Sequence, residues 1–382
     1  MANVLTDLAA DIYTAVDVVA REQVGFIPAV TINANASDRV AVGGVVRSCF
    51  TRPATAVDTT ASMTIPEGTD QTVDNKTATI DKSKAVQIPW TGEDIRSVRN
   101  GAGFETIYGS QIAQAMRTLA NLAEVDLATA AYQNASRAAG TAGTTPFATN
   151  HNSVNDVRQI LVDNGVPSGD AQLSLVMNTL AGTNFRNLGN LYKVNEAGSD
   201  VLLRQGVLQD ISGISMRESA GVVTHTKGTG AGYLINGAGG VVGAETLTID
   251  TGTGTILAGD IVTFAADTTN KYVNNTALAA NDIILGEPGL INAIANNNAL
   301  TVGNTYTGNV AFHRSAIELI VRPPAVPDGG DAAVDSMIVQ DPRSGLLFEI
   351  RVYKGYKKVM FEVALAWGVK AWMPKYIATL MG

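Results

Sequence analysis

One long, uninterrupted helical segment constrains this fold more than any other feature of the sequence. The segment runs from Phe104 to about Arg137, contains no proline, and has Gly109 as its only glycine. Its apolar residues recur every three or four positions and so share one helix face: Phe104, Tyr108, Ile112, Ala115, Leu119 and Leu122. At 1.5 Å per residue such a helix is roughly 50 Å long, whereas helices of compact domains usually have three or four turns. The segment therefore predicts a spine on which other parts of the fold are mounted.

A predicted β-arm precedes the spine. Between Arg52 and Trp90 the residues Thr, Asp, Val and Lys dominate, and prolines recur. Thr60–Ile65 and Thr77–Ile88 alternate in polarity, which favours two paired strands. A two-stranded hairpin with little to bury is marginally stable in water. We therefore expect the arm to lie on a neighbouring subunit, and an ordinary surface hairpin is the alternative.

A second β-rich region extends from about Val223 to Val310. Gly, Thr, Asn and Ala dominate it, and short alternating segments such as Thr246–Ile249 and Ile261–Phe264 predict strands. Turn residues recur about every ten positions, and no helical pattern occurs. The region predicts a small, separate β-barrel or sandwich inserted into a host domain.

The rest of the chain mixes helices with strands, so the predicted fold class is α+β. The expected helices are Leu5–Val19, Val154–Val162 with Asn152 or Ser153 as its N-cap, and Thr179–Tyr192. The expected strands are Leu173–Met177, Ala316–Val321, and a hairpin of Met337–Gln340 with Leu346–Lys354. A final apolar run, Val359–Ala371, ends before Pro374.

The composition favours extensive contact with other protein. Charged residues make up only 16% of the chain, below the roughly 25% of ordinary soluble domains, while 46% of the residues are hydrophobic. The formal net charge is −8. Tight nucleic-acid binding requires many neutralised phosphates, so nucleic acid is not expected as a tight, direct ligand.

Cysteine content and the amino terminus bear on the compartment. Cys49 is the only cysteine, so no intrachain disulfide can form, which is compatible with a reducing cytoplasm. Residues 1–8 contain no Lys or Arg, and no run of about 18 apolar residues occurs. Neither a secretory signal nor a membrane span is therefore expected.

No catalytic, cofactor or metal site is expected. The three histidines, His151, His225 and His313, lie far apart in the sequence, and one cysteine cannot build a cysteine-rich zinc site. A Gly-x-Ser-x-Gly elbow is absent, and no glycine directly precedes a lysine, which excludes a P-loop. Gly228-x-Gly230-x-Gly232 lacks the spacing of a dinucleotide fingerprint and predicts a turn or linker.

Two carboxylate pairs also have structural interpretations. Glu93 and Asp94 suit the amino-terminal region of the spine helix, where negative charge is favoured. Glu124 and Asp126 are two residues apart on a helix and so do not share a face. Neither pair resembles an acid–base couple, and a solvated structural role is expected for both.

Two lysine clusters leave alternatives open. Lys354, Lys357 and Lys358 surround two tyrosines, Tyr353 and Tyr356, and favour subunit salt bridges or a solvated strand end over contact with nucleic acid. The arm carries three further lysines: Lys76, Lys82 and Lys84. One of these could form an isopeptide bond with an Asn of a neighbouring subunit, but nothing in the sequence identifies the carboxylate that would catalyse it.

In this order of elements the chain resembles the major capsid proteins of tailed bacteriophages with the Hong Kong ninety-seven fold. Residues 203–219, LRQGVLQDISGISMRES, resemble that family's Gly-apolar-x-x-apolar-x-Gly-apolar pattern ending in Glu-Ser. Shorter similar segments are LSLVMN at 173–178, AFHRSA at 311–316, DPRSGL at 341–346, and WGV at 367–369 followed by Pro374. The resemblance spans nearly the whole chain, and its specificity lies in the order and spacing of motifs that are weak alone.

The resemblance implies a division of the chain into six parts. These are an amino-terminal arm and helix (1–51), an extended β-loop (52–92), a peripheral domain with the spine helix (93–150), an axial domain (151–222), an inserted β-domain (223–310), and return strands of the axial and peripheral domains (311–382). The insertion points to a short-tailed-phage subgroup, although it is shorter than is usual there.

The resemblance also implies partners. Copies of the chain would form hexamers and pentamers of an icosahedral virion shell around double-stranded DNA, touching the DNA only weakly and non-specifically. A scaffolding protein would template a procapsid in the host cytoplasm, and a portal protein would occupy one vertex. An outer decoration protein is left open.

Three other functions remain as alternatives. A nanocompartment shell protein of the same fold would lack the inserted β-region and show a groove for a cargo peptide. A surface-layer or adhesin protein would suit the Thr, Asn and Gly content but not the spine helix or the missing secretion signal. An enzyme would show a pocket with clustered titratable groups, and we expect none.

Overall fold

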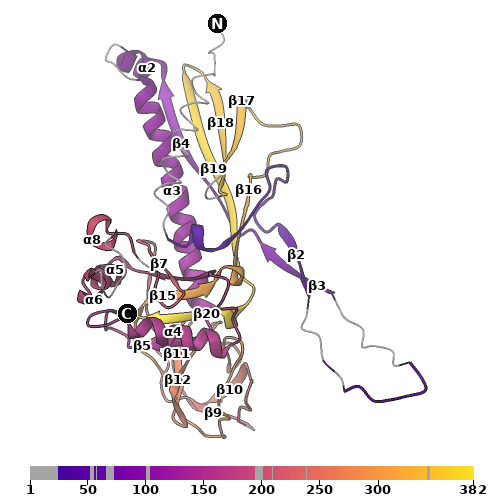
Figure 1. Ribbon diagram of the computed structural model, residues 1–382. Coiled ribbons are helices and arrows are strands. Elements are labelled where there is room, and N and C mark those ends of the chain that lie inside the picture. The colour runs from indigo at the N-terminus through magenta and orange to yellow at the C-terminus, as the bar shows by residue number, and fades with distance from the viewer. Residues whose placement is uncertain are drawn as a thin grey trace.

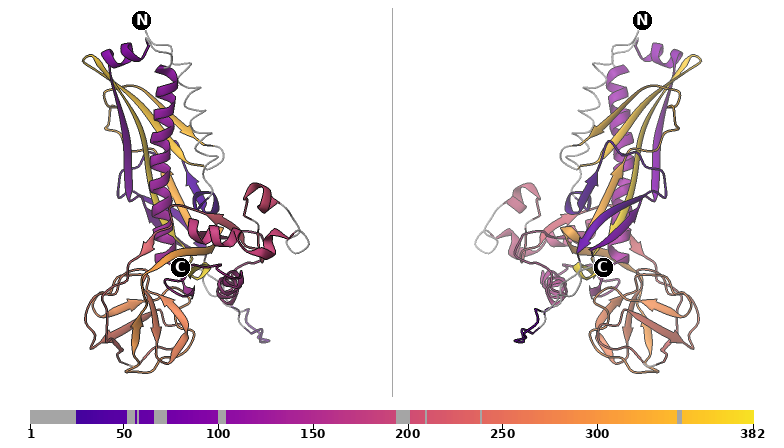
Figure 2. Two further views of the ribbon diagram at one scale, coloured as in Figure 1. Left: turned by 90° about the vertical axis from the view of Figure 1, so that its left-hand side faces the viewer. Right: turned by 90° about the vertical axis from the view of Figure 1, so that its right-hand side faces the viewer.

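The chain forms an elongated blade of sheet and helix that stands on a β-rich base (Figures 1 and 2). The computed structural model describes residues 25–51, 56, 58–65, 73–99, 104–193, 201–208, 210–237, 239–341 and 345–382. The predicted helix Leu5–Val19 lies outside these residues.

The predicted spine is confirmed as α3 (Phe104–Gln133), whose 30 residues give a length of about 45 Å. Its buried face includes Ile112 and Leu119, as predicted, but Leu122 is exposed and Ala123 is buried in its place. The helix stops before Arg137, because Arg137 already belongs to strand β5 (Arg137–Gly140).

A six-stranded peripheral sheet lies along the spine (Figure 1). Strand β19 (Lys358–Ala371) is its centre: it is antiparallel to β4 (Lys82–Thr91), β18 (Leu347–Gly355) and β16 (Ile317–Arg322). The edge strands are β17 (Ala333–Gln340), paired with β18, and β1 (Thr31–Ala34), which runs parallel to β16. The hairpin predicted near residues 337–354 is therefore confirmed, and the final apolar run is the longest strand of the sheet.

The predicted arm exists, but its strands lie elsewhere in the sequence. Strand β2 (Val45–Thr51) pairs with β3 (Val73–Thr79), and Thr60–Ile65 contains no strand. The alternating segment Thr77–Ile88 is divided at Ile80, because β3 ends on the arm and β4 then joins the peripheral sheet. Two of the three lysines assigned to the arm, Lys82 and Lys84, therefore belong to the sheet instead.

The base contains a nine-stranded mixed sheet. Its strand order is β14 (Leu300–Val302), β11 (Ile261–Phe264), β12 (Asp267–Val273), β5, β20 (Ile377–Met381), β15 (Tyr306–His313), β6 (Leu173–Met177) and β7 (Ser215–Glu218), with β8 (Thr224–His225) on β15. A three-stranded sheet of β13 (Asp282–Ile284), β10 (Thr246–Asp250) and β9 (Leu234–Ile235) lies beside it.

Residues 224–302, called the β-unit below, have a hydrophobic core of their own that includes Ile249, Phe264 and Tyr272. The strands predicted at residues 246–249 and 261–264 are confirmed as β10 and β11. Through β12 and β5 the unit nevertheless shares the nine-stranded sheet with the rest of the base. The six-part division of the chain stays a prediction.

Short helices surround the base sheet: α4 (Asn152–Asp163), α5 (Thr179–Arg186), α6 (Gly189–Tyr192) and α8 (Val201–Gln205). A further helix, α2 (Gly92–Arg99), lies at the far tip of the blade. The chain also forms three 3-10 turns: η1 (Ile27–Ala29), η2 (Arg314–Ala316) and η3 (Pro374–Tyr376). The cap predicted for α4 is wrong, since His151 occupies the N-cap position, and its side chain accepts no cap hydrogen bond. The helix predicted over Thr179–Tyr192 is broken into α5 and α6, between Arg186 and Gly189.

Candidate assembly surfaces

The arm leaves the body of the molecule and projects away from it (Figure 1). Met63 and Ile65 are almost completely exposed. In the absence of other protein they face water, and burying side chains of this size on a partner stabilises an interface by about 1.5–3 kcal/mol each. Burial of these two side chains on another protein would therefore stabilise such a contact.

The two strands of the arm are bonded to each other at its root, where Ile80 shares a buried hydrophobic cluster with Ile320 of β16 and Ala366 of β19. Gly43 N donates to Ile80 O at 2.9 Å, and Ile80 N donates to Gly44 O at 3.0 Å. Lys76 Nζ on β3 donates to Trp372 O at 3.3 Å. These bonds hold the first residues of the arm against the body while its far end projects away.

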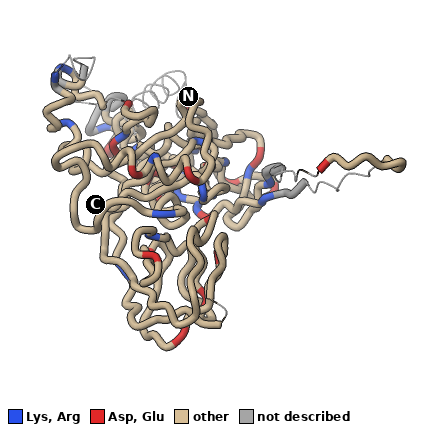
Figure 3. Tube along the Cα trace, turned by 60° about the horizontal axis from the view of Figure 1, so that its bottom comes forward, with Lys and Arg blue, Asp and Glu red and all other residues tan. Residues whose placement is uncertain are grey.

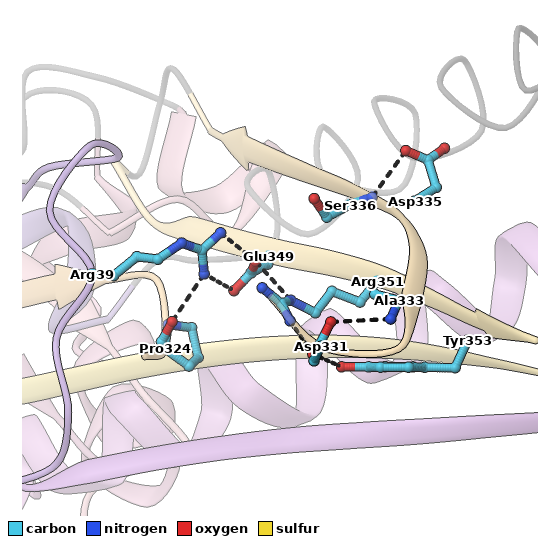
Figure 4. A network of polar contacts seen from close by, with 9 residues as sticks. All are labelled: Arg39, Pro324, Asp331, Ala333, Asp335, Ser336, Glu349, Arg351 and Tyr353. Carbon is cyan, nitrogen blue, oxygen red and sulfur yellow. Dashed lines mark hydrogen bonds and ion pairs between the residues drawn. The ribbon is translucent and has the colours of Figure 1, made fainter. Parts of the chain in front are cut away.

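A network of charged side chains lies beside the root (Figure 4). Glu349 on β18, only 1% exposed, accepts from Arg39 at 2.7 and 3.0 Å and from Arg351 Nε at 2.8 Å. Arg351 also pairs with Asp331, whose carboxylate accepts from Tyr353 Oη at 2.8 Å. Hydrogen bonds from Ala333 N and Tyr353, together with Arg351, lower the pKa of Asp331. The network joins the segment before β2 to β18 and to the loop that precedes β17.

Sequence reasoning missed this network. Arg39 and Glu349 are 310 positions apart, so no local pattern joins them. The one available signal was Glu349-x-Arg351, because residues two apart on a strand lie on the same sheet face.

The lysine cluster lies at the far tip of the blade, in the turn between β18 and β19. Lys354, Lys357 and Lys358 are exposed there and, with Glu93 of α2, line a hollow of about 720 Å³. The expectation that no pocket would gather titratable groups is therefore wrong as stated. The residues that line the hollow include no histidine, cysteine or serine.

The two carboxylates of the spine have structural roles, as predicted, but they are not simply solvated. Glu124 accepts from Phe26 N at 2.6 Å, Ile27 N at 2.9 Å and Ser219 Oγ at 2.7 Å. Asp126 pairs with Lys82 and accepts from Trp367 Nε1 at 2.8 Å. The two side chains contact different elements, in agreement with their different helix faces.

The carboxylates before the spine belong to a different helix from the one predicted. Glu93 and Asp94 lie in the first turn of α2 rather than at the start of α3. Asp94 Oδ2 accepts from Thr91 N at 3.3 Å, and Asp94 N donates to Thr91 Oγ1 at 3.1 Å. This reciprocal pair is a capping arrangement that satisfies free backbone donors at the helix start.

The three histidines have separate partners. His151 lies 3.3 Å from Asn190 Nδ2, and His225 lies 2.8 Å from Asp260. His313 lies 2.8 Å from Ser315 Oγ and 2.9 Å from Asp170, which superficially matches a Ser-His-Asp triad.

The geometry around His313 is that of a capped turn. Ser315 N donates to the His313 ring at 3.3 Å, so this histidine caps the turn η2 that contains the serine. The hydrogen bond from His313 lowers the pKa of Asp170. Within the described ranges, no three His, Cys, Asp or Glu side chains are grouped to hold a metal ion.

The segment 203–219, which carries the capsid resemblance, is held by specific contacts. Gly206 and Gly213 have φ angles of 68° and 73°, a region that glycine adopts without steric cost. Glu218 forms an ion pair with Arg186, and Ser219 donates to Glu124 on the spine. The Glu-Ser ending thus connects α5 and the spine to one edge of the base sheet. Residues 342–344 of the DPRSGL motif lie outside the described residues.

Among the described residues, no helix has the length and apolar character needed to span a membrane.

Comparison with known proteins finds similarity in structure alone. No protein-family profile matches the chain, and no curated protein matches its sequence. The capsid structure of the cyanophage P-SCSP1u matches with a TM-score of 0.51 and 10% identity, covering 94% of this chain and 88% of that one. A chain of Mycobacterium phage Che8 gives 0.48 and 14%, covering 94% and 91%, and a virus-like particle from Pyrococcus furiosus gives 0.44 and 9%, covering 97% and 98%. The likeness to the cyanophage capsid shows that this α+β chain has the Hong Kong ninety-seven-like capsid fold.

Proposed function

We propose that this chain is the major capsid protein of a tailed bacteriophage and that its copies form the hexamers and pentamers of an icosahedral shell around double-stranded DNA. The observation that carries the proposal is a shared fold over 94% of the chain with a phage capsid structure. Since a fold can serve several functions, the surfaces of the chain supply the further support.

The arm supports the proposal because it is unsuited to an isolated subunit. Within the described part of the chain, β2 and β3 pair only with each other, and the loop beyond them exposes Met63 and Ile65. A neighbouring copy would cover these side chains and pair with or pack on the arm.

Sparse charge fits a shell wall. Figure 3 shows acidic and basic residues scattered thinly over the base and the blade. With a net charge of −8, the chain would touch packaged DNA only weakly and non-specifically. Contacts between copies would then provide most of the shell's stability.

The proposal also covers the partner proteins of the chain and its location in the virion. A scaffolding protein would template a procapsid in the host cytoplasm, a portal protein would occupy one vertex, and the finished shell would be part of the virion. The β-unit would be the inserted domain of the short-tailed-phage subgroup, and it offers a surface on which neighbouring copies or a decoration protein could bind. No enzymatic activity, cofactor or metal is part of the proposal.

Negative-stain microscopy tests the proposal directly. The full chain is produced alone and together with any scaffolding gene found beside its own, and closed shells or sheets of hexamers are expected in at least one preparation. A stable monomer in both preparations, at low and high salt, would contradict the proposal. Shells that close without a scaffold and enclose protein instead of DNA would favour a nanocompartment of the same fold.

A further inference from the structure

The carboxyl-terminal end of the spine meets the β-unit at a buried polar centre. Asp260 of the β-unit is 1% exposed. Its carboxylate lies 2.8 Å from His225 Nε2, and it accepts from Gly228 N at 3.1 Å and Leu257 N at 2.7 Å. A buried carboxylate with this many partners fixes the segments that bear them, because leaving any donor unpaired is costly.

The imidazole of His225 connects this centre to the spine. Its ring centroid lies 5.4 Å from that of Tyr132, in the last turn of α3, and 5.4 Å from that of Tyr306 on β15. Tyr306 Oη donates to Gly259 O at 2.7 Å. Burial raises the pKa of both phenols, which therefore stay neutral in this apolar surrounding. The spine, the base sheet and the β-unit thus share one aromatic cluster.

Glycines bring the backbone of the β-unit directly against the helix end. A Cβ atom added at Gly259 would lie 2.5 Å from Tyr132 Cε2, and one added at Gly286 would lie 2.2 Å from Ala135 O. Both distances are far below van der Waals contact, so only glycine permits this packing.

The backbone also crosses the junction. Strand β12 of the β-unit pairs with β5, joining Lys271 to Ala138 and Tyr272 to Arg137. Strand β5 begins only four residues after α3 ends at Gln133. Both side views show the β-unit directly below the lower end of the spine (Figure 2).

We propose that this junction is a rigid joint, through which the β-unit and the carboxyl-terminal half of the spine move as one body. Packed interiors deform little, so a displacement of the β-unit would be passed to the spine instead of being absorbed by a flexible linker. A contact made by the β-unit therefore biases the position of the blade. The inference concerns a single chain and does not depend on shell formation.

Distance measurement by paired spin labels tests the joint. Labels are attached through Asn121→Cys, an exposed position in the carboxyl-terminal half of α3, and Val242→Cys on an exposed turn of the β-unit, in a Cys49→Ser background. The distance distribution in the full chain is expected to be narrow and single. Gly259→Ala, which places a methyl group against Tyr132, should increase the width of this distance distribution by about twofold or more.

Gly232→Ala is the matched control. Gly232 also has a positive φ, 73° against 92° for Gly259, but no atom lies within 4 Å of an added Cβ. It carries a similar backbone strain without touching the joint and should leave the distribution unchanged. If Gly259→Ala fails to fold, Asp260→Asn takes its place, with the exposed Glu245→Gln as its control. A broad distribution in the unsubstituted chain, or junction variants as narrow as their controls, would overturn the proposal.

Discussion

Replacing Glu349 by Gln removes one negative charge from the network beside the arm while keeping the shape of the side chain. The carboxylate is 1% exposed and accepts hydrogen bonds from Arg39 and Arg351. Removing one partner of a buried ion pair costs about 3–5 kcal/mol, because the other charge stays buried without compensation. We expect the lower end, about 3 kcal/mol. Arg39 is 32% exposed and can be rehydrated, and Arg351 keeps Asp331 as a partner.

The loss can be measured as a shift of the thermal unfolding midpoint of the unassembled chain. An unfolding entropy of about 2.1 cal/mol/K per residue gives about 0.8 kcal/mol/K for 382 residues, so 3 kcal/mol corresponds to about 4 °C. The control is Glu245→Gln, the same substitution at an exposed glutamate of the β-unit. The control should move the midpoint by about 1 °C or less. Equal shifts for the two variants, or none for Glu349→Gln, would refute the argument that burial makes this carboxylate important.

Three further predictions concern other parts of the chain. Replacing both Met63 and Ile65 by Ser should leave the unassembled chain folded but raise the concentration needed for assembly, since about 3–6 kcal/mol of burial per contact is lost. Light scattering measures that concentration. The exposed pair Val241→Ser, Val242→Ser on the β-unit is the control, and equal effects would contradict the role of the arm. Gly368→Ala should destabilise the chain by about 1–3 kcal/mol in thermal unfolding, because the added Cβ would lie 2.2 Å from Thr79 O. The control is Gly43→Ala, which meets no atom within 4 Å and should cost about 1 kcal/mol. A larger loss of stability for Gly43→Ala than for Gly368→Ala would show that the contact with Thr79 is not decisive. Burial, followed by the hydrogen bond to Asp267, raises the pKa of Tyr272 to about 12. The neutral phenol therefore contributes stability that is complete below pH 10 and falls by about 2–3 kcal/mol as pH rises from 10 to 12. Thermal unfolding midpoints measured over this pH range should fall less for Tyr272→Phe than for the unsubstituted chain, and parallel plots of midpoint against pH would exclude Tyr272 as the cause.

Local periodicity predicted those elements whose burial is decided by their own sequence. The spine, β6, β11 and the β17–β18 hairpin were located because the apolar residues of each follow the pattern of a helix or of a strand. The prediction was wrong where one alternating segment serves two environments. Thr77–Ile88 alternates at both ends, with Ala78 and Ile80 before the polar run 81–84 and Val86 and Ile88 after it. The structure divides the segment at that polar run, because β3 ends on the arm and β4 begins in the peripheral sheet.

Long-range polar contacts were beyond the reach of the sequence. Glu124 gave no sign that it would bind Phe26 and Ser219, which lie 98 and 95 residues away. The joint around Asp260 was equally hidden. The glycine-rich composition of residues 223–310 suggested a separate unit, but glycine also permits the close approach of Gly259 and Gly286 to the end of the spine. Composition does not distinguish a flexible linker from a tightly packed backbone.

The two ends of the arm have different energetic roles. Its root is held by backbone bonds between Gly43 and Ile80 and by Arg39 on Glu349, all within one chain. Its far end exposes Met63 and Ile65, whose burial would require a second chain. Changes at the root should therefore alter the stability of the single chain, and changes at the far end should alter assembly alone. If Met63 and Ile65 substitutions lowered the unfolding midpoint of the unassembled chain as much as Glu349→Gln does, the arm would be packed on its own subunit, and its exposed side chains would be no argument for a shell.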